Sequence, residues 1–489
     1  MIKFTAVSLV RTKVEMLAVP VCEDTTIHED PQIQALIASA TALEEFKAED
    51  KQEVMLYHPA ETKVQRCLCM GMGKRRKLSA ETLRSFAGRA VQAAIKARRS
   101  NLVIAVPQAE TVGLELQTMA QAIMEGALLA NDVFDAYKEK SKDKPLKEIA
   151  LRTVPAASKS LAGLVAKTET ICSSTLLARH WINTPSNRKV PAQLAQMVTT
   201  EARKAGLAIN TLSEAKLKQQ HFGALLAVAA GSSHPPCLLE LRYAPKGARK
   251  TIVLVGKGVT FDTGGISLKQ SSGMDAMKGD MSGAAAVAAA LIAAAQLKPR
   301  HRVIGIMPMV ENMPSGTATR PGDIVTSYAG KTVEIGNTDA EGRLILIDAM
   351  AYAVKKYKPD VMIDLATLTG ACVVALGEKI AAVFSKDDEL AKTVAASGEA
   401  VYERCWPMPL AEDYKELLKS DYADISNMPS TRYGGAITAA LFLSEFVGET
   451  RWAHIDIAGP AFGKKNGDYC GPGGTGFGVR LLCDLIEKL

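Results

Sequence analysis

The chain has 489 residues, of which 47% are hydrophobic and 23% charged, with a formal charge of +7 at pH 7. These fractions are those of a soluble globular protein, and the length exceeds that of one ordinary domain, so we expect two domains. No stretch reaches the ~18 apolar residues that a membrane span needs, and residues 1–10 carry no cleavage signal, so we expect neither a membrane protein nor a secreted one.

The basic excess is mild for a chain of this length, and the pI is about 8.8. A basic surface can attract nucleic acid or acidic lipids, although a solvated surface is its ordinary interpretation. The basic run at residues 74–77 has no interleaved aromatic residues that could stack on bases. The nine cysteines include Cys67 and Cys69, which lack the C-x-x-C spacing of a metal or redox pair. We therefore expect free thiols in a reducing compartment, the cytoplasm.

The N-terminal third alternates strand-like and helix-like segments. Residues 14–19 and 102–106 predict strands, and residues 79–98 and 118–132 predict helices, because apolar residues recur three and four positions apart in the latter. Ser79, ahead of an apolar run, resembles a helix start. The charged run at residues 138–147 predicts a surface loop. We assign residues 1–160 to a smaller N-terminal α/β domain.

A helix predicted at about residues 168–181 is followed by Asn183 and Pro185, which favour a turn and stop a helix. We take residues 161–185 as a linker helix and residues 186–489 as a larger C-terminal domain, which carries the chemistry. Its predicted elements alternate: strands at residues 251–255, 302–309, 361–365 and 453–457, and helices at residues 277–296 and 343–357. Such alternation implies an α/β fold with a mainly parallel or mixed central sheet flanked by helices.

Three acidic clusters lie at or beside the loops that join these elements, where ligands bind in such folds. The first follows the strand at residues 251–255 and contains glycines that let the backbone turn tightly near a ligand. The second opens the alanine-rich helix, and the third directly precedes the helix at residues 343–357. Their carboxylates are Asp262, Asp280, Asp339 and Glu341.

Each cluster by itself has an ordinary structural interpretation as a glycine turn or a helix cap. A dinucleotide-binding loop is excluded, because Phe261 stands where the third glycine should follow Gly256 and Gly258. A phosphate-binding loop near residues 71–74 is excluded as well, because its first glycine would fall on Leu68.

The coincidence of the clusters favours a metal site. Four converging carboxylates repel one another unless cations neutralise them. Two divalent ions about 3.5–4 Å apart would do so, and such a pair can activate a water and polarise a carbonyl oxygen. No histidine lies in these loops. Oxygen ligands favour manganese or magnesium, although zinc also accepts carboxylates.

The eight residues 337–344, Asn-Thr-Asp-Ala-Glu-Gly-Arg-Leu, resemble the signature of the leucyl aminopeptidase family, the cytosol aminopeptidases with two metals. The segments around Lys257 and Asp262, the run ending at Asp280, and residues 311–316 and 320–323 resemble the family too. The likeness covers roughly residues 170–489. The first 150 or so residues match only in length and in being α/β.

The resemblance implies a set of metal ligands. Asp262 and Glu341 would bridge the two metals, Lys257 and Asp280 would complete the shell of one, and Asp339 that of the other. A lysine ligand must be neutral, and burial beside a dication lowers the pKa of an amine.

The resemblance also implies two catalytic residues. Lys269 would stay charged and bind the oxyanion of the tetrahedral intermediate. Arg343 would hold a bicarbonate ion that acts as the general base, which fits loops that contain no spare histidine or glutamate. Without the motif, a solvated lysine and a helix-surface ion pair would be the ordinary interpretations of these two residues.

Eight further residues would surround the substrate by the same resemblance. They are Met277, Asn337, Ala340, Thr367, Leu368, Gly370, Ala458 and Ala461. Many relatives carry methionine where Ala461 stands, so the preference for the first side chain stays open and a roomier pocket is one alternative.

The prediction is therefore a metal-dependent aminopeptidase, a cytoplasmic hydrolase and metalloprotease that releases leucine-like residues from the amino ends of peptides. It would bind two divalent ions per subunit, Mn²⁺ or Zn²⁺ with Mg²⁺ as an alternative, and bicarbonate on Arg343. The resemblance implies a hexamer, and we describe the N-terminal domain as macro-like, with an assembly or regulatory role.

Two other functions stay open. Some relatives bind DNA, so the resemblance permits a DNA-binding role, alone or as a second function. Another two-metal hydrolase, such as a phosphatase, would need further arginines or backbone nests near the metals, and the loops offer Arg343 without a clear second arginine.

Overall fold

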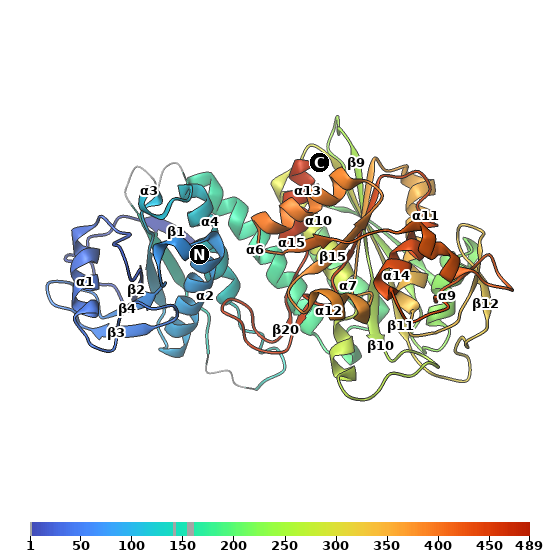
Figure 1. Ribbon diagram of the computed structural model, residues 1–489, viewed down its shortest axis with the longest axis horizontal. Helices are drawn as coiled ribbons and strands as arrows, with labels where there is room; N and C mark the ends of the chain where they lie inside the picture. The colour runs from blue at the N-terminus through green and yellow to red at the C-terminus, as the bar shows by residue number, and fades with distance from the viewer. Residues whose placement is uncertain (1, 140–142, 154–160) are drawn as a thin grey trace. The chain divides into compact units, whose positions relative to one another are not determined.

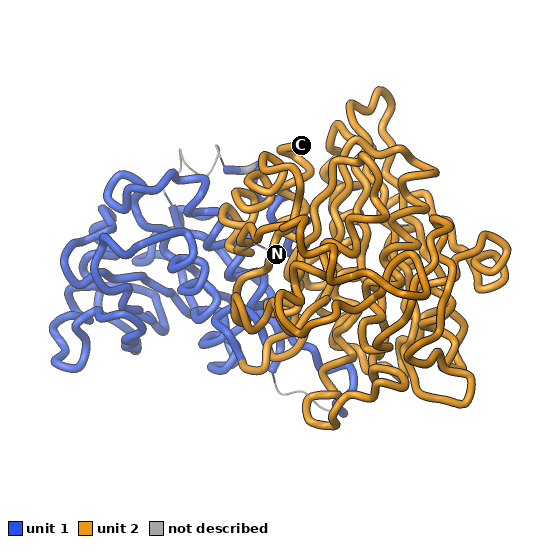
Figure 2. The backbone as a smooth tube through the Cα atoms, turned by 45° about the vertical axis from the view of Figure 1, so that its right-hand side comes forward, with its two compact units in different colours: residues 1–173, 466–471 blue, residues 174–465, 472–489 orange. Residues whose placement is uncertain are grey.

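The computed structural model describes residues 2–139, 143–153 and 161–489, and the chain divides into two compact units (Figures 1 and 2). Unit 1 comprises residues 1–173 and 466–471, and unit 2 comprises residues 174–465 and 472–489. The division falls inside α6 (Ala162–Asn183), which extends beyond both ends of the helix predicted there. The predicted boundary at residue 160 and part of the predicted loop at residues 138–147 lie outside the described residues.

Unit 1 is built on a six-stranded sheet in the order β1-β6-β5-β2-β4-β3. Its strands are parallel except for β3, which pairs antiparallel with β4. The strands are β1 (Ile2–Thr5), β2 (Leu17–Val21), β3 (Glu53–Tyr57), β4 (Arg66–Gly71), β5 (Asn101–Ala105) and β6 (Glu148–Arg152). The helices are α1 (Pro31–Thr41), η1 (Arg75–Lys77), α2 (Ala80–Lys96), α3 (Ala109–Val112) and α4 (Leu116–Ala130).

The helix start predicted at Ser79 is confirmed. The Ser79 hydroxyl accepts from the Thr82 amide at 3.2 Å, and the Thr82 hydroxyl accepts from the Ser79 amide at 2.9 Å. This reciprocal pair satisfies two amides that a helix end otherwise leaves free. The buried face of α2 includes Leu83, Phe86 and Val91, at the spacing that the sequence shows.

Unit 2 contains a nine-stranded mixed sheet in the order β16-β15-β18-β14-β9-β11-β8-β7, with β10 beside β11. The four strands from β18 to β11 run parallel, as the sequence predicts. In contrast, β8 pairs antiparallel with β7 and β11, and β15 pairs antiparallel with β18 and parallel with β16. The strands are β7 (Ala208–Ser213), β8 (Cys237–Tyr243), β9 (Thr251–Gly256), β10 (Gly258–Asp262), β11 (Arg302–Asn312), β14 (Val361–Ala366), β15 (Ala381–Ser385), β16 (Cys405–Pro407) and β18 (Trp452–Asp456).

Helices cover both faces of this sheet (Figure 1): α10, α15, α13 and α7 pack on one face, and α11, α9 and α14 on the other. The helices are η2 (Ser186–Arg188), α7 (Pro191–Lys204), α8 (Glu214–Gln219), α9 (Gly223–Ala229), η3 (Met274–Gly279), α10 (Ser282–Leu297), α11 (Glu341–Tyr357), α12 (Gly370–Leu376), α13 (Asp388–Ala400), η4 (Glu412–Leu418), α14 (Gly435–Ser444) and α15 (Val479–Lys488). Two small sheets hold β12 (Ile324–Thr326), β13 (Thr332–Glu334) and β17 (Ile425–Ser426), and β19 (Phe462–Gly463) and β20 (Gly473–Gly474).

The alanine-rich segment differs from its prediction. A 3₁₀ turn, η3, precedes α10, which begins at Ser282, so Asp280 lies between the two elements and not in the first turn of a long helix. Small residues let α10 lie directly on the sheet: a Cβ on Gly283 would stand 2.1 Å from the Leu365 carbonyl oxygen.

The expectation that no segment has the length and apolarity of a membrane span is wrong for residues Met274–Leu297. This stretch is long and apolar enough by composition, with a mean hydropathy of 1.5, because alanines dominate it and few charges interrupt it. However, 83% of the 18-residue window is buried inside the protein, as in the core helix of a folded domain.

Candidate active site

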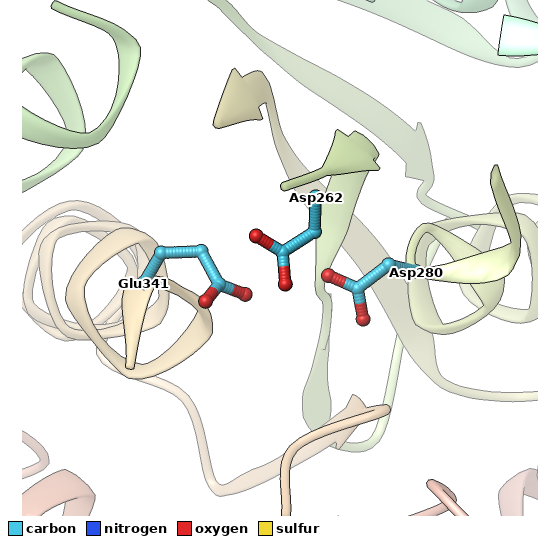
Figure 3. A group of neighbouring side chains, drawn as sticks. All are labelled: Asp262, Asp280 and Glu341. Atoms are coloured by element: carbon cyan, nitrogen blue, oxygen red, sulfur yellow. The ribbon is translucent and has the colours of Figure 1, made fainter. Parts of the chain in front are cut away.

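Three carboxylates converge at the carboxyl edge of the parallel strands (Figure 3). Asp262 is the last residue of β10, Asp280 follows η3, and Glu341 is the first residue of α11. One oxygen of each lies within 4.8 Å of the others, and all three side chains are buried. The predicted meeting of acidic residues from separate segments is therefore observed for these three.

Two lysines each join two carboxylates of the site, which include the fourth predicted carboxylate, Asp339. The Lys257 ammonium lies 2.9 Å from Asp280 Oδ1 and 2.7 Å from Glu341 Oε1. The Lys269 ammonium lies 2.8 Å from Asp262 Oδ2 and also pairs with Asp339. Asp339 is thus connected to the site through Lys269, and its side chain is more exposed than that of Asp262.

The carboxylates carry more negative charge than the two lysines balance. Burial, reinforced by Asp262, raises the pKa of Asp280 to about 6 and that of Glu341 to about 8. Burial alone would favour a neutral amine at Lys257, but the surrounding carboxylates outweigh it and raise the pKa of that residue. Asp280 Oδ2 is buried without a hydrogen-bond partner among the described residues. A buried, oxygen-rich cluster with excess negative charge fits divalent cations.

These pKa shifts predict how the metal-free protein responds to pH. An unfolded chain releases the Glu341 proton near its ordinary pKa of 4.5, whereas the folded protein retains it up to about pH 8. The free energy of unfolding should therefore fall as pH rises from about 5 to about 8, by about 1–3 kcal/mol. Chelator-treated protein unfolded in urea across this range tests the sign, and stability that rises with pH would contradict it.

Two asparagine side chains hold the Asp262 carboxylate and the backbone that leads into α11. Asn312, at the end of β11, donates to Asp262 Oδ1 at 2.8 Å and to the Thr338 carbonyl oxygen at 3.1 Å. Asn427 accepts from the Gly336 amide at 2.8 Å and donates to the Asn337 carbonyl oxygen at 2.9 Å. Sequence reasoning missed both residues. One feature of the sequence could have identified Asn312. It is a polar residue at the end of an apolar strand, inside a segment that already resembled the family.

Gly342 leaves the space in which Lys257 lies. A Cβ at this helical position would stand 2.6 Å from Lys257 Cε and 2.7 Å from its Nζ. Alanine normally stabilises a helix by about 1 kcal/mol relative to glycine.

Gly342→Ala should nevertheless lower the peptidase activity that the sequence predicts by about tenfold or more, because the lysine must move away from Asp280 and Glu341. The measurement is kcat/KM on a leucine anilide beside a thermal unfolding curve. Full activity in a folded variant would show that the lysine position is not critical.

The Arg343 side chain is buried, so it does not lie on the helix surface, where its ordinary interpretation would place it in an ion pair. Its Nη1 donates to the Asn427 carbonyl oxygen at 2.8 Å, and its Nε has no hydrogen-bond partner within the part of the chain that the structure describes. Burial lowers the pKa of Arg343 to about 10, against the opposing effect of Glu341 and Asp456. The side chain remains a cation with a free donor, an arrangement that suits an anion.

The predicted substrate residues lie on segments that adjoin the cluster. Thr367 makes the closest connection: its hydroxyl donates to Asp280 Oδ1 at 2.6 Å, and its carbonyl oxygen accepts from Lys257 at 2.8 Å. Leu368 and Gly370 follow it, Met277 lies on η3, and Asn337 and Ala340 precede α11. Ala458 and Ala461 follow β18, and Ala461 is almost fully buried.

Comparison with known proteins identifies relatives over the whole chain. The model described as "Cytosol aminopeptidase family, catalytic domain" matches residues 176–483, and the one for the N-terminal domain of that family matches residues 22–141. A probable cytosol aminopeptidase of Chlorobium limicola is 42% identical, with coverage of 100% of this chain and 99% of the relative. One of a Geobacter species is 44% identical, with coverage of 91% and 90%.

Solved structures show the same fold. A mutant of tomato leucine aminopeptidase superposes with a TM-score of 0.88 at 34% identity, with coverage of 100% of this chain and 96% of that one. The bottromycin maturation enzyme BotP in complex with Mn superposes with a TM-score of 0.87 at 35% identity, with coverage of 97% and 99%.

Proposed function

The chain belongs to the cytosol aminopeptidase family, a family of metal-dependent peptide hydrolases, and on this premise we propose that it releases leucine-like residues from peptides with the help of two divalent ions. Lys257, Asp262, Asp280, Asp339 and Glu341 would hold the ions. The observation that carries the proposal is the buried meeting of three carboxylates from separate segments. Manganese in the related structure favours Mn²⁺, with Zn²⁺ and Mg²⁺ as alternatives.

When bound, the two ions would supply positive charge that polarises the scissile carbonyl and makes a water nucleophilic near neutral pH. As a ligand, Lys257 must be neutral. Beside carboxylates alone its pKa is raised, and dications next to the same carboxylates reverse that balance.

Lys269 has the charge and the access for stabilising an oxyanion. Its side chain is 25% exposed, whereas that of Lys257 is 4% exposed, so Lys269 can reach a substrate from the open side of the cluster. Asp262 and Asp339 hold its ammonium in place and, against the effect of burial, raise its pKa. Such a preorganised cation stabilises charge that develops in the transition state more than it stabilises the bound substrate.

Arg343 would hold a bicarbonate ion as the general base. The support is its buried guanidinium with a free Nε donor and the lack of a histidine among the described residues that meet at the carboxylate cluster. The anion would offset the burial that lowers the pKa of Arg343.

One assay tests this function directly. A panel of amino-acid anilides and phosphate esters is offered to the protein as purified, after chelation, and after Mn²⁺, Zn²⁺ or Mg²⁺ is restored singly. Hydrolysis of leucine anilide that is lost on chelation and regained with metal supports the proposal. Preference for phosphate esters would favour the phosphatase alternative.

The remaining properties extend this proposal. We propose a cytoplasmic protein, because the nine cysteines, all among the described residues, form no disulfide, and a homohexamer by family resemblance, which sedimentation tests. A DNA-binding role is a second candidate, supported by the exposed basic residues Lys74, Arg75, Arg76 and Lys77 in unit 1. Binding that weakens steeply with salt would support it, and no binding at low salt would exclude it.

A further inference from the structure

Asp456 is a fully buried carboxylate that the proposed mechanism does not use. It is the last residue of β18, at the same sheet edge as the metal cluster. Its Oδ1 accepts from the amides of Leu368 and Ala458, each at 3.1 Å, and its Oδ2 accepts from the Thr369 hydroxyl at 2.7 Å. All its hydrogen-bond donors thus come from the two segments that leave β14 and β18.

A buried carboxylate is costly unless hydrogen bonds or a cation compensate for the lost water. Among the residues that the structure describes, no lysine or arginine forms a direct ion pair with Asp456, and the buried Arg343 attracts it only at longer range, so the three donors provide the direct compensation. An apolar side chain would fill an ordinary strand end without this cost. We therefore expect the Asp456 carboxylate to hold the two segments that follow β14 and β18.

We propose that Asp456 is a positioning residue for substrate, which holds residues 367–370 and 458–461 in a fixed arrangement beside the metal cluster. The inference rests on the proposed function, because these segments carry the predicted substrate residues. Thr367, at one end of the first segment, donates to Asp280 at 2.6 Å. Thr369, two residues on, is bound by Asp456, so the segment is fixed to the cluster at one point and to the neighbouring strand at the other.

The hydrogen-bond pattern matches a carboxylate at this position. The Thr369 hydroxyl donates to Asp456 and accepts from the Cys372 amide at 3.0 Å, which caps α12. Both oxygens of residue 456 accept in this pattern, and replacing Oδ2 by an amide nitrogen would leave the Thr369 hydroxyl proton without this acceptor. Asparagine offers one acceptor and turns a donor toward one of the three partners, and alanine offers none.

The variants D456A and D456N test this role against a matched control, D364N. Asp364 is equally buried, on the adjacent strand β14, and accepts from Trp452 Nε1 at 2.7 Å and pairs with His454 Nδ1 at 2.6 Å. Its side-chain partners lie within the sheet and not in the loops, so D364N reports general damage to the core.

We expect D456A to lower kcat/KM for leucine anilide by about 10²-fold, with KM raised as well as kcat lowered, because a displacement of about 1 Å costs this much. D456N should lie between D456A and the original protein, and D364N should stay within about threefold of the original protein. Mn²⁺ affinity, measured by calorimetry, should be unchanged in all three variants, because the hydrogen-bond partners of the Asp456 and Asp364 carboxylates do not include the proposed metal-binding residues.

Hydrogen exchange on the full chain gives a readout that does not depend on turnover. In D456A, amides of residues 367–372 and 457–461 should exchange faster together, while D364N leaves both segments protected. Equal losses of kcat/KM in D456A and D364N, or wild-type exchange in D456A, would overturn the inference. If the original protein hydrolyses no anilide, the proposed function fails, and the exchange pattern still decides whether Asp456 fixes the two segments.

Discussion

Lys269→Ala should lower kcat for leucine anilide by about 10²–10³-fold, while KM changes by less than about threefold. The Lys269 ammonium is held by Asp262 at 2.8 Å and by Asp339, and it is the more exposed of the two lysines in the cluster. Its charge matters most when negative charge develops on the substrate oxygen, so its loss should appear in turnover and not in substrate binding.

Two measurements separate this role from loss of metal. Because Lys269 competes with cations for Asp262 and Asp339, the alanine variant should bind Mn²⁺ at least as tightly as the original protein. Lys331→Ala removes a lysine that pairs with Glu445 at 2.9 Å, away from the cluster, and should leave kcat unchanged. Near-normal turnover in Lys269→Ala would remove this residue from the mechanism.

Glu341→Gln should reduce kcat by about 10³-fold or more and weaken Mn²⁺ binding by at least about 100-fold. Glu341 is fully buried beside Asp262 and Asp280, and its negative charge is what a bound cation would neutralise. Glutamine keeps the shape of the side chain but removes the charge.

The same substitution should act differently on the metal-free protein. Burial and the repulsion of Asp262 raise the pKa of Glu341 to about 8, so chelated Glu341→Gln should lose much of the fall in stability between pH 5 and pH 8. Glu445→Gln, from the ion pair with Lys331, serves as the control and should keep activity, metal affinity and pH dependence. Activity of Glu341→Gln at normal Mn²⁺ levels would contradict a ligand role.

Local patterns in the sequence were sufficient for several elements. The apolar runs of β9, β11, β14 and β18 and the helix start at Ser79 follow from the residues within each segment, because hydrophobic periodicity and capping act over a few positions. Asp339 and Glu341 were recognisable for the same reason, since the motif at residues 337–344 is continuous in the chain. The strands β7, β8, β10 and β15 were missed: β10 is short and glycine-flanked, with a register shift before Asp262.

Only the tertiary structure could identify the groups that hold the site together. Asn312 is 50 residues from Asp262, Asp456 is 88 residues from Leu368, and Asn427 is 90 residues from Asn337. Gly342, in α11, likewise matters because Lys257, between β9 and β10, lies against it.

The sequence by itself thus determined the family, the fold class and the identity of the acidic side chains. The order of strands in the sheet decided which of those side chains meet and which buried polar residues hold them. The physical reason is that residue types set local conformation and chemistry, whereas contacts between distant segments depend on the packing of whole elements, which no short stretch of sequence encodes.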